Sequence, residues 1–278
     1  MRRETRSASS QPLRHRSHDN AHNRPAFAAR MQTSYDCRMP SWNIHSAHVE
    51  ALLKERSPQE LGIRDVNAFL FGNYLPDVYV GYMVRPTTRI IVYNDTHFAD
   101  PGFVPEPRYW EFWRRYGLPS ADSDGCVSDL VLGAWCHLVA DNAYNHDVNR
   151  FIEGVGIRPG ETTRIRKQGD FDLFGRTLDL RLECHLDDEL LRQAHAFPQY
   201  PVIEPDLRAS VAAASSIVRD NHRRRVEGAP CYSMLTPELF SSMFDEVQQR
   251  MLEGLLAYAE QGASAEPLGR EGPRARRR

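Results

Sequence analysis

Residues 126–151, which read CVSDLVLGAWCHLVADNAYNHDVNRF, decide the fold class of this chain. Apolar residues recur in this stretch at spacings of three and four, the period of a helix with a buried face. No proline interrupts it, and Gly154, Gly156 and Pro159 follow it closely. We therefore expect one long helix from about Cys126 to about Phe151.

Similar periodicity on both sides of this stretch predicts an all-α fold, a single multi-helix domain. Four prolines punctuate residues 74–105, where we expect irregular structure, with residues 90–93 as a short strand or an extended linker. The other predicted helices cover residues 43–56, 66–72, 107–116, 171–196 with Asp170 as N-cap, 205–226 and 237–260.

Charge and composition set the limits of this domain. Residues 1–38 carry eight arginines against three acids and show no apolar periodicity, so we expect a disordered basic tail. Met39 is an alternative start, which would make residues 1–38 a gene-model extension. Residues 262–278 are rich in Gly, Pro and Arg and are predicted to form a second disordered tail. The all-α domain is then residues 39–261.

The overall charge of the 278 residues is −2, but the two basic ends leave an acidic domain between them. An acidic body argues against nucleic acid as a partner, because phosphate contacts need clustered Lys and Arg. The sequence contains no apolar run of membrane-spanning length and no readable secretory signal. Five widely spaced cysteines without a CxxC pair fit a reducing compartment, so we expect a cytoplasmic protein.

The long predicted helix carries the strongest candidate for chemistry. His137 and Asp141 are four residues apart, so their side chains share one helical face and are able to ligate one cation. Three further residues are candidates on weaker local grounds. Asp77 follows Pro76 in a rigid turn, His97 lies in the irregular region, and His45 begins the first helix.

Four motifs occur in order along the chain: MPSWxIH at 39–45, GNxLPD at 72–77, THF at 96–98 and HLxxD at 137–141. This ordered set resembles the zinc-dependent phospholipase C family, and in particular its bacterial intracellular branch, whose members begin with MPS. The resemblance covers about residues 39–175.

The resemblance implies a set of zinc ligands, residue by residue. His45, Asp77, His97, His137 and Asp141 match family residues that bind zinc, and Asp77 also matches the residue that activates the attacking water. It further implies a metal-dependent phosphoester hydrolase in which the activated water attacks a phosphodiester. The expected partner is a small phosphoester or a phospholipid headgroup.

The sequence also departs from the family pattern. His146 stands five residues after Asp141, where the family has a histidine six residues after, and on a continuous helix it would face away from His137. Arg164 and Gln168 stand where a later HxxxE motif would supply further ligands. We keep His146 as a candidate metal ligand beside the five residues named above. These candidates are enough to bind one Zn²⁺ and make a second Zn²⁺ plausible. The residues that would bind a third are missing.

Arg164, Arg166 and Lys167 belong to a basic cluster within the acidic domain, together with Arg176. Arginine binds phosphate oxygens in a bidentate manner, so these residues are candidates for a phosphate-binding loop. The alternative is a solvated turn that leads into the next helix.

Two other functions stay open at this point. A descendant of the same family that lost ligands would be a metal-stabilised helical binding or scaffold protein without activity. An HD-type phosphohydrolase would use the adjacent His146 and Asp147, with His97 upstream and Asp172 downstream. The sequence alone fixes neither the substrate nor the oligomeric state.

Overall fold

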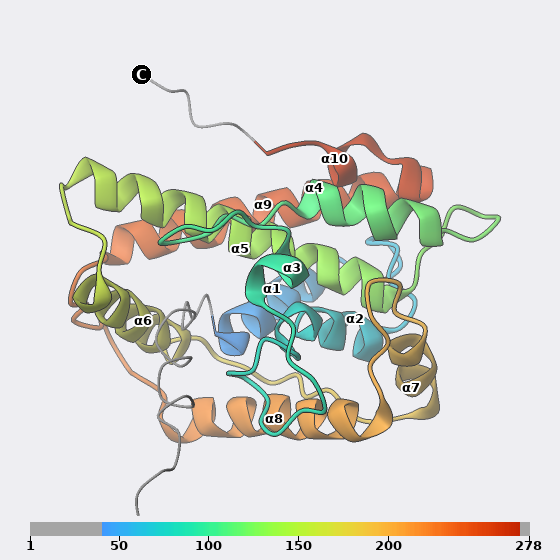
Figure 1. The fold of residues 1–278 in the computed structure, drawn as a ribbon, viewed down its shortest axis with the longest axis horizontal. Coiled ribbons are helices and arrows are strands. Elements are labelled where there is room, and N and C mark those ends of the chain that lie inside the picture. Colours follow the sequence, from blue (N-terminus) through green and yellow to red (C-terminus); the bar gives the residue numbers. More distant parts are fainter. Residues whose placement is uncertain (1–40, 273–278) are drawn as a thin grey trace, which may run out of the picture. The chain divides into compact units, whose positions relative to one another are not determined.

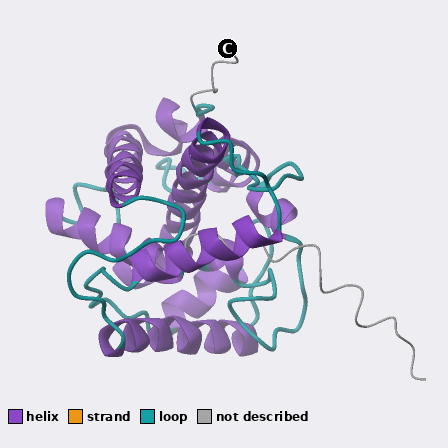
Figure 2. Ribbon diagram, turned by 90° about the vertical axis from the view of Figure 1, so that its left-hand side faces the viewer, coloured by secondary structure: helices purple, strands orange, loops and turns teal. Residues whose placement is uncertain are grey.

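The computed structural model describes residues 41–272, and these residues form helices and loops without a strand (Figure 2). The all-α prediction is confirmed. Residues 1–40, with the predicted N-terminal tail and Met39, and residues 273–278 lie outside the described residues. The elements are α1 (Trp42–Glu55), α2 (Val66–Gly72), η1 (Leu75–Asp77), α3 (Tyr93–His97), α4 (Tyr109–Phe112), η2 (Trp113–Gly117), η3 (Leu118–Ser120), α5 (Asp129–Gly154), α6 (Glu161–Gly175), α7 (Asp188–His195), α8 (Glu204–Arg223), α9 (Pro237–Gln261), η4 (Gly262–Ser264) and α10 (Glu266–Gly269).

Helix α5 is the predicted long helix, and the other elements are built around it. Every side chain from its first residue to Asn145 is buried, and α9 runs alongside it (Figure 1). Helix α2 crosses α5 where two glycines meet. A Cβ on Gly133 would lie 2.2 Å from the carbonyl oxygen of Phe69 and 2.8 Å from the Cα of Gly72. Only two glycines allow the backbones to approach this closely.

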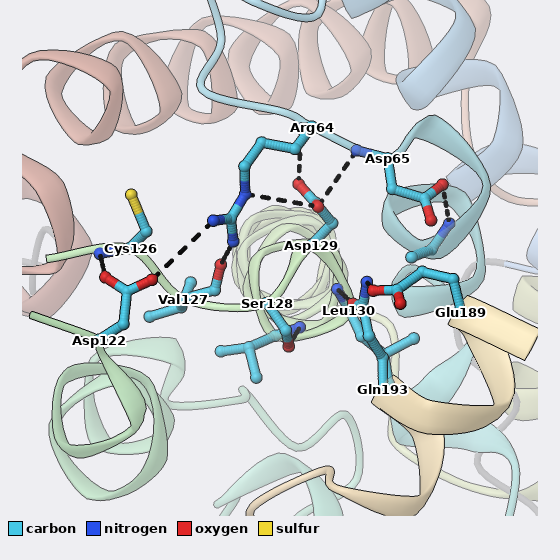
Figure 3. Close-up of polar contacts among 12 residues, drawn as sticks. Arg64, Asp65, Asp122, Cys126, Val127, Ser128, Asp129, Leu130, Glu189 and Gln193 are labelled. Atoms are coloured by element: carbon cyan, nitrogen blue, oxygen red, sulfur yellow. Dashed lines mark hydrogen bonds and ion pairs between the residues drawn. The ribbon is translucent and has the colours of Figure 1, made fainter. Parts of the chain in front are cut away.

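The N-terminal end of α5 is fixed by a polar network (Figure 3). The Ser128 side chain accepts a hydrogen bond from the backbone N–H of Val131, so the helix begins three residues later than Cys126, the predicted start. The Asp129 carboxylate accepts the backbone N–H groups of Arg64 and Asp65 at 3.0 and 3.1 Å. This carboxylate therefore ties the start of α5 to the segment that leads into α2.

The predictions for α1, α2, α8 and α9 are confirmed to within about three residues at each end. The prediction of a single helix over 171–196 is wrong. Helix α6 ends at Gly175, where a Cβ would lie 2.2 Å from the Asn43 side chain of α1. Asp170 lies inside α6 rather than at an N-cap, and it accepts backbone N–H groups from residues 233–235.

An extended segment, residues 176–187, separates α6 from α7. Its even-numbered residues from Leu178 to Leu186 are buried or half-buried and its odd-numbered residues from Asp179 to His185 are exposed, a period of two. Side chains of neighbouring helices satisfy its backbone: Glu50 accepts the N–H groups of residues 181 and 182, and Asn67 accepts that of residue 185. Residues 178–186, LDLRLECHL, alternate between apolar and polar side chains, which indicates an extended chain. The prediction of one helix over 171–196 did not take this alternation into account.

The region predicted as irregular, residues 74–105, holds the short helices η1 and α3. Of the two alternatives for residues 90–93, the strand is wrong: residues 90–92 are irregular with an extended Val92, and Tyr93 begins α3. The predicted helix over 107–116 is divided into α4 and the wider turn of η2.

The part of the predicted C-terminal tail that the structure describes, residues 262–272, is ordered. Leu268 is completely buried, and the indole N–H of Trp135 donates to its carbonyl oxygen at 3.0 Å. The domain therefore extends past the predicted limit at residue 261. None of the helices in residues 41–272 combines the length and the apolar character that crossing a bilayer requires.

Candidate metal centre

Five predicted ligands meet in the interior of the fold, and they come from four separate elements. His45 comes from α1, Asp77 from η1, His97 from α3, and His137 and Asp141 from α5. Each of the five is at most 2% exposed. A cluster of three imidazoles and two carboxylates therefore lies out of contact with bulk water, where uncompensated charge is costly.

The polar atoms of these side chains face one another at short range. His97 Nε2 and His137 Nε2 are 3.0 Å apart. Asp141 Oδ2 lies 3.6 Å from the first of these nitrogens and 3.7 Å from the second, and Asp141 Oδ1 lies 3.3 Å from His45 Nε2. Asp77 Oδ1 lies 3.7 Å from His97 Nε2.

The crossing of α2 and α5 sets the orientation of His137. Directly after Gly72, the carbonyl oxygen of Asn73 accepts a hydrogen bond from His137 Nδ1–H at 2.8 Å. A carbonyl oxygen is only an acceptor, so Nδ1 carries the proton and Nε2 presents a lone pair toward the cluster.

His97 is oriented in the same way by its own helix. Its Nδ1 lies 2.7 Å from Thr96 Oγ1, and the Thr96 hydroxyl donates in turn to the carbonyl oxygen of Tyr93. The Nδ1–H of His97 is therefore the donor, and its Nε2 also presents a lone pair. Two lone pairs 3.0 Å apart repel each other, and a cation between the nitrogens removes that repulsion.

Both carboxylates are held by side chains around the cluster. The indole N–H of Trp42 donates to Asp77 Oδ2 at 3.1 Å, and the Tyr82 hydroxyl donates to Asp77 Oδ1 at 2.9 Å. The Tyr93 hydroxyl donates to Asp141 Oδ2 at 3.0 Å, while its ring stacks on His97 with centroids 3.7 Å apart. Such contacts from a second layer fix the orientation of metal ligands.

Burial sets the protonation of the cluster in the absence of a cation. It raises the pKa of Asp77 and that of Asp141 to about 6. Burial also lowers the pKa of His97 and of His137, and so keeps the imidazoles neutral. Neutral imidazole is the form that binds a metal, and a cation would favour the ionised form of both carboxylates.

The cluster divides into two groups of potential ligands that share one histidine. His45, His137 and Asp141 form the first group, and Asp77, His97 and His137 form the second. A tetrahedral zinc site with ligands at 2.0–2.1 Å has edges of about 3.3 Å, close to the separations observed here. These buried groups could therefore hold a metal ion.

A cleft of about 370 Å³ opens above Asp77. Its walls come from the start of α1, the loop after η1, and helices α6 and α8 with the residues that follow them. The residues that line it are Ser41, Asn43, Asp77, Tyr82, Met83, Gln168, Asp172, Arg176, Ile217, Asp220, Asn221 and Arg224. Asp77 belongs both to the buried cluster and to the floor of this cleft, so the cluster and the cleft form one site.

His146, the sixth predicted ligand, is not part of the cluster. Its Nδ1 lies 3.3 Å from Glu106 Oε2, and the side chain is half-buried. The helix is unbroken between His137 and His146, and nine residues rotate the second histidine to the opposite face. The adjacent Asp147 has no place in the cluster either.

The residues predicted to bind phosphate lie outside the lining of the cleft. Arg164 pairs with Glu161, and Arg166 donates to the carbonyl oxygen of Ser233. Lys167 is 1% exposed, and its charge lowers the pKa of Asp141 against the larger effect of burial. Arg176 is the one member of the predicted basic cluster that lines the cleft.

Tyr82 and Tyr93 are the residues of this site that sequence reasoning missed. Tyr93 precedes His97 by four residues, a spacing that puts both side chains on one face of a helix. This signal has no meaning under the prediction of irregular structure for residues 74–105. Tyr82 left no comparable signal, because only the turn of the chain after η1 brings it back to Asp77.

Comparisons with known proteins found no match to this chain among protein-family models, curated proteins or solved structures.

Proposed function

We propose that this chain is a zinc-dependent phosphoester hydrolase of the phospholipase C type, acting in the cleft above Asp77. One observation carries the proposal: a buried cluster of three imidazoles and two carboxylates reaches the cleft through a single carboxylate. Zinc, a borderline-soft cation, accepts this mixture of nitrogen and oxygen ligands. The ordered motifs in the sequence that resemble the phospholipase C family support the same assignment.

His45, His97, His137 and Asp141 would hold the zinc, and Asp77 would join them from the floor of the cleft. When bound, zinc supplies a Lewis acid that polarises a phosphoryl oxygen and makes a neighbouring water more acidic. The rest of the chemistry falls to the side chains of this chain.

Asp77 is the candidate catalytic base. Trp42 and Tyr82 each donate a hydrogen bond to one oxygen of the Asp77 carboxylate. These contacts hold the carboxylate in a fixed orientation, from which it would accept a proton from a water in the cleft. As the water oxygen forms its bond to phosphorus, Asp77 accepts one water proton. The ester oxygen leaves with the electron pair of the broken phosphorus–oxygen bond and takes a proton from solvent.

The proposal is tested by metal content and hydrolysis on the same preparations of the full chain. We expect at least one zinc per chain and hydrolysis of bis(4-nitrophenyl) phosphate that a chelator abolishes. The double variant His137→Ala, Asp141→Ala should lose the metal. Asp77→Asn should lower kcat by about 100-fold or more, the usual contribution of a general base.

His146→Gln is the matched control, because this histidine lies outside the cluster and should be dispensable for both metal and activity. Zinc without hydrolysis would contradict the enzyme and leave the metal-stabilised scaffold as the function. A folded chain that takes up no metal would contradict both. The HD-type alternative requires His146, so full activity of His146→Gln would exclude it.

A further inference from the structure

Two arginines line the cleft, each at the C-terminal end of a helix. Arg176 is the first residue after α6, and Arg224 is the first residue after α8. Both belong to the same lining as Asp77. A substrate whose scissile bond lies at Asp77 would therefore share the cleft with two guanidinium groups.

The carboxylates of the cleft already have partners. Asp220 pairs with Arg223, which does not line the cleft, and Asp172 accepts a hydrogen bond from Gln168 Nε2 at 2.9 Å. Within the described residues, neither carboxylate lies within ion-pair distance of the two cleft arginines, although, after the hydrogen bond from Arg223 and its charge, the charge of Arg224 also lowers the pKa of Asp220.

The guanidinium groups have far fewer partners. The Nε–H of Arg176 donates a hydrogen bond to the carbonyl oxygen of Asp172 at 3.3 Å. Within residues 41–272, no hydrogen bond or ion pair engages its terminal nitrogens, and none engages the side chain of Arg224. A guanidinium group whose N–H donors are not used within the protein is able to bind two oxygens of a phosphate or a carboxylate in a bidentate manner.

We propose that Arg176 and Arg224 form an anion subsite, and that the substrate carries a phosphate or carboxylate group in addition to the ester that is cleaved. This inference rests on the proposed function for the position of the scissile bond. Among the described residues of the lining, Gln168 keeps one amide atom without a hydrogen-bond partner, its buried Oε1.

The first test measures the binding of inorganic phosphate to the purified full chain by titration calorimetry at low salt. The double variant Arg176→Gln, Arg224→Gln should bind phosphate about tenfold more weakly or worse. Arg219→Gln is the control, because Arg219 lies on α8, is exposed and pairs with Glu183. It should bind phosphate like the wild type.

Succinate, titrated in the same way, distinguishes the source of the anion. Tighter binding of phosphate assigns the subsite to a phosphate group, and tighter binding of succinate assigns it to a carboxylate. The double variant Arg176→Lys, Arg224→Lys keeps the charge without the planar fork, so it should retain part of the affinity. Its melting temperature, with that of the glutamine variant, shows that any loss is not a loss of fold.

Two results would overturn the inference: phosphate and succinate both failing to bind the wild type, or binding it and the glutamine variant equally. Failure of the proposed hydrolase is a separate result. A chain that binds phosphate through these arginines but hydrolyses nothing would keep the subsite and lose the catalytic assignment.

Discussion

At the scale of single residues, the Tyr93 hydroxyl is the contact most directly tied to metal affinity. It donates to Asp141 while its ring stacks on His97, so one side chain positions two ligands. Tyr93→Phe keeps the ring and removes the donor. We expect zinc affinity to fall about tenfold to a hundredfold, measured by competition with a chelating dye.

Tyr258→Phe is the control for this prediction. Tyr258 is also buried, and its hydroxyl accepts a hydrogen bond from the backbone N–H of Val127, just before the start of α5 and ten residues before His137. Its loss should lower the free energy of unfolding by about 1 kcal/mol and leave zinc affinity unchanged. Equal affinities in wild type and Tyr93→Phe would show that Asp141 needs no such support.

At the same scale, the sequence predicted the clustered residues better than it predicted their surroundings. Motif order identified all five clustered residues, and helical phase already placed His146 on the far face. The donors Trp42 and Tyr82 could not be assigned to Asp77, because their contacts depend on how α1 and the loop after η1 pack in three dimensions. A single sequence carries no local signal for such contacts.

At the scale of elements, the close contact between Gly72 of α2 and Gly133 of α5 sets the positions of the residues that follow it in the two segments, Asn73 and the cluster residue His137. Gly133→Ala would place a methyl group 2.2 Å from the carbonyl oxygen of Phe69 and force the helices apart. We expect the free energy of unfolding to fall by about 3 kcal/mol, measured by urea denaturation. The Asn73 carbonyl that orients His137 would shift with α2, so metal affinity should fall as well.

Gly169→Ala is the matched control, since Gly169 lies inside α6 and a Cβ there would meet no atom within 4 Å. It should stabilise the protein by about 0.5–1 kcal/mol through helix propensity. Equal changes in stability for the two substitutions would contradict a special role of the helix crossing in the first result.

The same scale shows where sequence reading of elements succeeds and fails. Long helices such as α5, α8 and α9 could be predicted, because their helical pattern persists over many residues. The prediction of a single helix over 171–196 is wrong. Within the described residues, the extended segment after α6 forms hydrogen bonds from its backbone to side chains of α1, α2 and α8 instead of to a neighbouring strand. Those partners lie far away in sequence.

At the scale of the whole molecule, residues 262–272 belong to the domain rather than to a tail. Leu268 is fully buried, and the indole N–H groups of Trp113 and Trp135 donate to the carbonyl oxygens of Ala263 and Leu268. A chain that ends at Gln261 loses one buried leucine and leaves two buried donors without acceptors. We expect a loss of at least about 3 kcal/mol in the free energy of unfolding, measured by thermal and urea denaturation.

A chain that ends at Gly272 keeps all of these contacts and is the control for the truncation. Its stability should equal that of the full chain. If the shorter chain ending at Gln261 is equally stable, residues 262–272 contribute only local order.

The scattering of the ligands along the chain has a consequence for the order of events during synthesis. Asp141 is the last of the five, so the full set has been made when about half of the 278 residues remain to be added. Helix α9, which packs along α5, is not yet present at that stage. Of the five, only His137 and Asp141 lie on one helix and can come together through local folding. The other three join them only when loops of tens of residues close, which costs chain entropy. Uptake of the proposed metal would then be a late event that follows the closure of these loops.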